Sequence, residues 1–192
     1  MLKKFTVSLL LSLCCQFVLQ AEVQKVTIKW TAMACKELCV QGLAKQFYLI
    51  KGVSNVQIDQ GAGQAILTWK PDQIFTFAPI NTAMSMIGLA INNIQIKVRG
   101  TVRHDDRTVT LVSIGDGTLF QLIGPVMPSP SQYVIQYNTG SRTLPPHLRE
   151  ELLEGEAGSQ VAMIEGPLLM PERSPPLQLV IERLQFSKPQ EE

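Results

Sequence analysis

Residues 25–50 read KVTIKWTAMACKELCVQGLAKQFYLI and join two different periodicities of apolar side chains. Within Val26–Trp30 every second residue is apolar, which is typical of a half-buried strand. From Val40 onward the apolar residues recur every three or four positions, which is the spacing of one helix face. Cys35 and Cys39 stand between the two patterns. The stretch therefore predicts a strand, a loop that carries both thiols, and an amphipathic helix.

Residues 51–99 continue with further strand-like and helix-like apolar patterns. Gly52 is the predicted stop of the first helix, and Pro79 suits the first turn of a second helix. The predicted segments are a strand around Val56–Ile58, a turn at Gly61–Gly63, a strand at Ala65–Trp69, a helix through Ile80–Ile91 and a strand at Ile94–Val98. This order predicts an α+β fold of the split-βαβ, ferredoxin-like kind, with both helices on one face of a four-stranded antiparallel sheet.

Residues 24–99 resemble the heavy-metal-associated domain, the module of copper chaperones and of the N-terminal arms of copper-transporting ATPases. That family has a Met-x-Cys-x-x-Cys loop, a helix that ends near Gly-Val, and a Gly-aromatic pair after the second helix. This chain has Met33, Cys35, Cys39, Gly52-Val53 and Gly88-Leu89 in the corresponding places. It departs from the family in having three residues between the cysteines, and Leu89 where an aromatic is expected.

The resemblance implies a metal site formed by Cys35 and Cys39. A thiol at a helix N-terminus is favoured as its thiolate. Two thiolates suit Cu(I), a soft ion that accepts low coordination, whereas Zn(II) takes about four ligands. Thioether contacts from Met33, Met84 and Met86 are a further option, and core filling is the alternative for these methionines.

Two other fates of the cysteines stay open at this point. An oxidising compartment favours a Cys35–Cys39 disulfide, with a structural or redox role. The two thiols could also have no shared role. A thioredoxin-like redox function fits least well, because neither the cysteine spacing nor the fold matches that pattern.

The first 21 residues read as a secretory signal peptide, with Lys3 and Lys4 before an apolar run and cleavage expected after Ala21. That run is shorter than the roughly 20 residues of a membrane span. Lipoprotein processing at Cys14 and a retained signal anchor are the lesser alternatives. Cleavage leaves Cys35 and Cys39 as the remaining cysteines, and an exported, periplasmic location is expected.

The second half predicts a β-rich domain. It offers strands at 98–102, 109–114 and 119–123, a helix at 148–153, and strands at 161–164 and 177–184. Three strands, a helix and two strands is the order of an OB-fold, a small five-stranded barrel. We therefore expect a heavy-metal-associated-like domain at 22–99, an OB-like barrel at 100–187 and a polar tail at 188–192. One continuous strand near Val98–Gly100 would join the two domains.

Several functions are disfavoured by the sequence. Loss of Lys3 and Lys4 leaves 15 of the 17 basic residues against 16 acidic ones. This nearly neutral balance lacks the excess of positive charge that is typical of nucleic-acid-binding proteins. No nucleophile motif is present, so no enzyme is expected. His104-Asp105-Asp106 predicts turn chemistry rather than a catalytic cluster, and His147 is expected to be exposed. The leading expectation is an exported, non-catalytic Cu(I)-binding protein. The alternative is an envelope structural or protein-interaction module with a Cys35–Cys39 disulfide, whose barrel binds a protein partner.

Overall fold

A computed structural model describes residues 23–31, 37–125 and 143–188 of the chain. The predicted signal peptide, Met33, Cys35 and positions 189–192 of the predicted tail lie outside the described residues. The elements, in chain order, are β1 (Val23–Lys29), α1 (Glu37–Tyr48), β2 (Val53–Asp59), β3 (Gln64–Trp69), α2 (Ala78–Met86), β4 (Asn93–His104), β5 (Val109–Ser113), β6 (Leu119–Ile123), α3 (Pro146–Ala157), β7 (Val161–Leu169), β8 (Leu177–Val180) and β9 (Arg183–Ser187). The predicted mixed α+β class is confirmed. Within the described residues, no helix combines the length and apolar character needed to span a bilayer.

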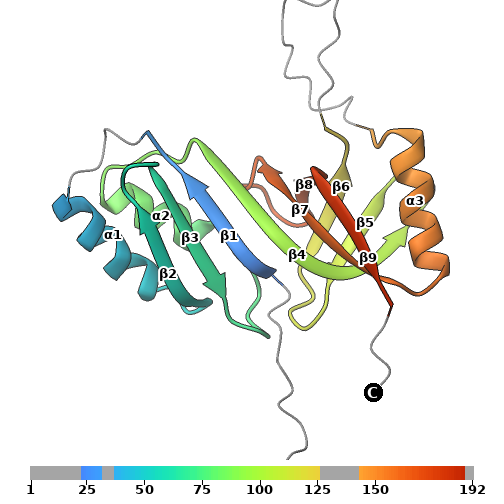
Figure 1. Cartoon of the computed structure of the whole chain (residues 1–192), viewed down its shortest axis with the longest axis horizontal. Helices are drawn as coiled ribbons and strands as arrows, with labels where there is room; N and C mark the ends of the chain where they lie inside the picture. Colours follow the sequence, from blue (N-terminus) through green and yellow to red (C-terminus); the bar gives the residue numbers. More distant parts are fainter. Residues whose placement is uncertain (1–22, 32–36, 126–142, 189–192) are drawn as a thin grey trace, which may run out of the picture.

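The first half is an antiparallel sheet with strand order β2-β3-β1-β4. Helices α1 and α2 contact each other and pack beside this sheet (Figure 1). The predicted helix face is buried, since Leu43 and Phe47 of α1 are fully enclosed together with Ile28 of β1 and Leu67 of β3. Alternation in the strands and three-to-four spacing in the helix thus bring the same apolar set into one core.

The second half contains a closed five-stranded barrel. Strands β4, β5 and β6 pair antiparallel in sequence, and β6 then pairs parallel with β8. Strand β7 closes the ring, because it pairs antiparallel with both β8 and β4. Helix α3 lies at one end of this half, beside β9 (Figure 1).

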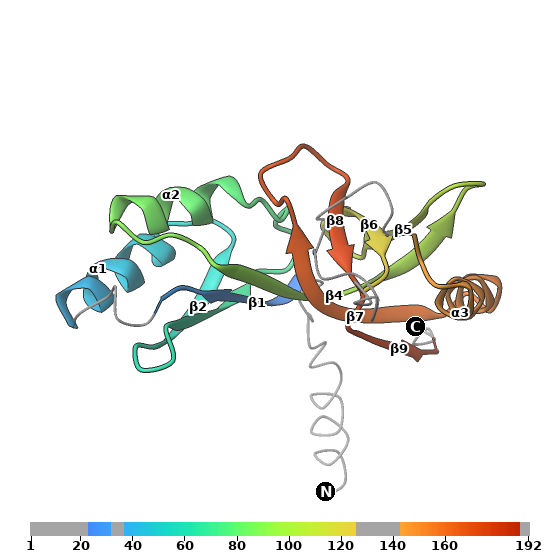
Figure 2. The same cartoon turned by 90° about the horizontal axis from the view of Figure 1, so that it is seen from above.

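Strand β4 belongs to both halves, as the continuous strand near Val98–Gly100 predicts (Figure 2). Its first part pairs with β1 and its last part pairs with β5, while β7 pairs across the middle. Buried residues continue at every second position from Ile94 to Val102, all of them apolar side chains except Gly100. The predicted boundary between residues 99 and 100 falls inside this strand, and the division into two domains stays a prediction.

The helices end earlier than the apolar spacing predicts. Helix α1 ends at Tyr48, yet Ile50 beyond it remains buried. Helix α2 ends at Met86, before Ile87 and Ile91, because Gly88 adopts a left-handed φ of 76° that a helix cannot contain.

The last predicted strand, Leu177–Leu184, is two strands instead of one. Leu168 and Glu165 are three residues apart along β7. Their partners, Leu179 of β8 and Arg183 of β9, are four residues apart. The extra residue is a one-residue register shift of the β-bulge type. It also explains why the apolar positions 177, 179 and 181 are followed by Leu184 rather than by an apolar residue at 183.

Candidate functional site

Cys39 is the third residue of α1 and lies one short connection after β1, an inner strand of the sheet. Its side chain is partly buried and packs against the apolar core. The N–H groups of a first helical turn have no carbonyl partner within the helix, so they favour a negative charge there. Cys39 is disulfide-bonded in this structure. It is the sole cysteine among the described residues, so its partner is not one of them.

The end of β1 is tied to the connection that precedes β4. The backbone N–H of Asn92 donates to the carbonyl of Lys29 at 2.8 Å, and the Asn92 side-chain amide donates to the Thr31 hydroxyl at 3.1 Å. These bonds fix the chain where it leaves the sheet toward the cysteine loop. No sequence pattern predicted this role for Asn92.

The three methionines considered as ligands have different outcomes. Met84 is fully buried in the core, so core filling rather than metal contact describes it. Met86 is 65% exposed and lines a groove together with Gln46 and Leu49. Met33 lies outside the described residues.

The Gly88-Leu89 pair has a clear structural role. Gly88 takes the left-handed conformation that ends α2, and its N–H donates to the carbonyl of Ser85 at 2.9 Å. Leu89 then turns into the core, where it is 4% exposed. An apolar side chain at this position is therefore explained by packing, whether aromatic or aliphatic.

Other candidate clusters resolve into local structure. Within the described ranges no three His, Cys, Asp or Glu side chains converge as a metal site would require. His104 contacts Glu156 of α3 at 2.5 Å, and His147 is exposed as predicted. The Asp105 carboxylate accepts hydrogen bonds from the Thr108 hydroxyl and from the N–H groups of Thr108 and Arg107. These bonds, that from the Thr108 hydroxyl foremost, lower the pKa of Asp105 below its ordinary 3.8. The prediction of turn chemistry is confirmed.

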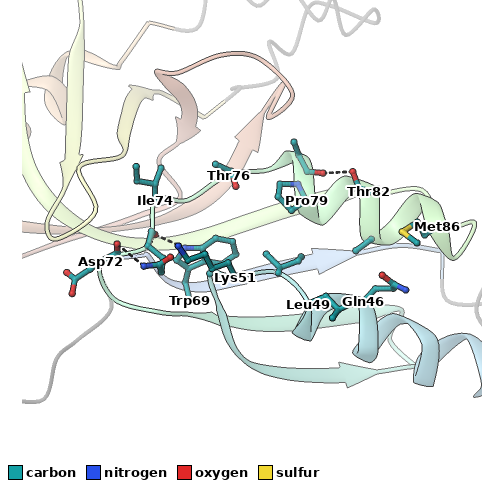
Figure 3. Close-up of a pocket in the computed structure, with 15 residues that line it drawn as sticks. Gln46, Leu49, Lys51, Trp69, Asp72, Ile74, Thr76, Pro79, Thr82 and Met86 are labelled. Atoms are coloured by element: carbon teal, nitrogen blue, oxygen red, sulfur yellow. Dashed lines mark hydrogen bonds between the residues drawn. The ribbon is translucent and has the colours of Figure 1, made fainter.

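A second surface feature, missed by sequence reasoning, is a groove of about 840 Å³ between α1, α2 and the connection from β3 to α2 (Figure 3). One wall, the helix-end wall, is formed by residues Leu49–Gly52. The facing wall, the loop wall, is the segment Asp72–Thr76, whose residues other than Phe75 line the groove, with the Trp69 ring at its base. Residues of α2 line the rest of the groove. Two apolar residues outside the predicted buried faces could have indicated this groove. They are Leu49, next to buried Ile50, and Ile74, in a polar connection.

No family model and no curated protein matches this chain. Among solved structures, the crystal structure of oxidized MerP from Ralstonia metallidurans CH34 is similar, with 22% sequence identity and a TM-score of 0.30. The match covers 36% of this chain and 96% of that one. A TM-score this low does not establish a shared fold.

Proposed function

We propose that this chain is an exported, non-catalytic heavy-metal-binding protein in which the thiolates of Cys35 and Cys39 hold one Cu(I) ion. The observation that carries the proposal is the place of Cys39, in the first turn of the helix that directly follows an inner strand. Cys35 precedes it by four residues in the sequence, and we propose that it supplies the second sulfur.

The proposal includes an assignment of the two halves. We take the first as a ferredoxin-like sandwich, because its strand order is β2-β3-β1-β4 and its two helices contact each other beside the sheet. We take the second as an OB-like barrel, supported by five strands in a closed ring and a helix between its third and fourth strands.

The donor set fits a soft ion only in its reduced form. Thiolates select Cu(I) and other soft metals, and a two-sulfur site leaves such an ion able to pass to another thiol site. A disulfide has no thiolate to offer, so reduction of Cys39 must come before metal binding. The helix dipole at the start of α1 favours the thiolate that the ion requires.

A second candidate function is favoured by the disulfide itself. In this alternative Cys35 and Cys39 are permanently joined, the bond fixes the start of α1, and the barrel binds a protein partner. An oxidising, exported location is the environment in which such a bond persists.

One titration separates the two functions. Purified protein is reduced, transferred to anaerobic buffer and titrated with Cu(I) against a competing chelator. The proposal expects one ion per chain, lost in Cys39→Ala and in Cys35→Ala but retained in Met86→Leu, the matched control at an exposed sulfur. A disulfide that persists in air and reforms quickly after reduction, with no copper retained by the reduced form, would assign the cysteines to the structural alternative. Sequencing the N-terminus of the protein made in cells tests export.

A further inference from the structure

Three of the five exposed large apolar side chains in the described residues line one groove. The five are Tyr48, Leu49, Ile74, Met86 and Leu119. Those that line the groove between α1, α2 and the loop wall are Leu49, Ile74 and Met86, and Tyr48 is the neighbour of Leu49. Leu49 is 71% exposed and Ile74 65%. Exposed apolar side chains that share one groove mark an interaction surface more than single scattered ones do.

The two walls of the groove carry complementary side chains. The helix-end wall presents Leu49 and the cation Lys51, and the loop wall presents Ile74 and the anion Asp72 (Figure 3). Neither Lys51 nor Asp72 has an ion-pair partner within the described part of the chain. Each wall therefore offers one exposed aliphatic group and one charge, and the charges have opposite signs.

Both walls are held in place before any partner binds. The N–H of Lys70 donates to the carbonyl of Gly52 at 2.7 Å, which joins the base of one wall to the other. In the loop wall, the Phe75 N–H donates to Asp116 at 3.1 Å and to the Thr118 hydroxyl at 3.2 Å. A surface fixed in this way loses little conformational entropy on binding.

We infer that this groove is a self-association surface, and that its occupant is a second copy of the same chain related by a two-fold axis. In such an interface a contact between residues i and j occurs twice, once in each direction. The helix-end wall of each copy then meets the loop wall of the other, which pairs Lys51 with Asp72 and Leu49 with Ile74. The formal net charge is +1 for the full sequence and −1 without Lys3 and Lys4 (15 basic against 16 acidic residues), so it adds little repulsion between two copies.

Sedimentation velocity of the purified protein tests this inference. Reductant is kept throughout, so that a disulfide between copies cannot imitate the interface. The expected result is a mass that rises with concentration toward that of two chains. Leu49→Glu should weaken the dimer by about tenfold or more, because it places a carboxylate in an apolar contact. Leu119→Glu, at an exposed apolar side chain outside the groove, is the matched control and should not change the dimer.

Charge variants test the pairing itself. Lys51→Glu should weaken the dimer, because it faces the partner's Asp72 with a like charge. Asp72→Asn alone should also weaken it, yet should strengthen it when added to Lys51→Glu. Asn is chosen because Asp72 has a φ of 59°, a conformation that Asn tolerates. A single-chain mass at every concentration would overturn the inference. So would a dimer indifferent to Leu49→Glu, or a monomer whose groove binds only other apolar peptides.

Discussion

Gly52 is a position where one added methyl group should be costly. A Cβ there would lie 2.2 Å from Cζ2 and 2.3 Å from Cε2 of Trp69, a ring that is 2% exposed. Ordinary carbon–carbon contacts begin at about 3.5 Å, so the ring must move by about 1.3 Å. The Trp69 Nε1–H donates to the carbonyl of Gln73 at 2.8 Å, and the ring packs edge-on against Phe75. Gly52→Ala therefore disturbs one hydrogen bond and one aromatic contact together.

The change in the free energy of unfolding is the sum of two destabilising effects and one that offsets them. Overpacking costs about 1–3 kcal/mol, and a weakened hydrogen bond adds about 0.5–1.5 kcal/mol. Loss of glycine freedom in the unfolded chain offsets about 0.4–1 kcal/mol, because Gly52 is not in the left-handed region. Gly52→Ala should thus lower the free energy of unfolding by about 2 kcal/mol, and Tm by about 4–8 °C.

Urea unfolding followed by tryptophan fluorescence measures this change. Gly61→Ala is the matched control, because its Cβ would meet only the Asp59 carboxylate, at an ordinary 3.5 Å. The same Gly52→Ala change should cost less in a Trp69→Leu background, where the ring is gone. A Gly52→Ala protein as stable as the parent, or a cost unchanged by Trp69→Leu, would refute this reasoning.

Three further predictions concern the core, the junction and one turn. Met84 is a fully buried core residue, so Met84→Leu should leave Cu(I) affinity unchanged and lower the free energy of unfolding by less than about 1.5 kcal/mol. A copper titration checks the first result and urea unfolding the second. Asp116→Ala should cost about 1–3 kcal/mol and speed hydrogen exchange at the Phe75 amide, because it removes an acceptor joining the two halves, whereas exposed Asp106→Ala should cost at most about 0.5 kcal/mol. The pKa of Asp105 is lowered in the folded chain, so the stabilisation from its hydrogen bonds is present above pH 3.8 and is lost as the pH falls through the folded pKa. NMR shifts of the Arg107 and Thr108 amides should therefore titrate with a midpoint below pH 3.8.

Local patterns predicted the elements that local forces determine. Alternation at Val26–Trp30 predicted β1, and the spacing of Leu43 and Phe47 predicted the buried face of α1. Both depend on periodicity, which the sequence displays directly. The Asp116-Gly117 turn between β5 and β6 is likewise local, because Gly117 supplies a left-handed φ of 68°.

Contacts between distant residues could not be predicted in this way. The role of Gly52 depends on Trp69, and the bond from Phe75 to Asp116 spans 41 residues. No short pattern marks either contact, and Gly52 was interpreted as a helix stop because glycine serves that purpose elsewhere. The candidate metal site was predictable only as a pair of thiols, and Cys35 lies outside the described residues.

The two proposed sites lie at opposite ends of α1, so they can be tested independently. Cys39 and Leu49 are ten residues apart, which corresponds to about 15 Å along a helix axis. Changes farther apart than about 7–10 Å that share no partner usually have additive effects. Cys39→Ala should therefore abolish copper binding without altering the dimer measured under reductant, and Leu49→Glu should do the reverse. A loss of both properties in either variant would show that α1 itself had been disturbed, and the assignment of two separate sites would be wrong.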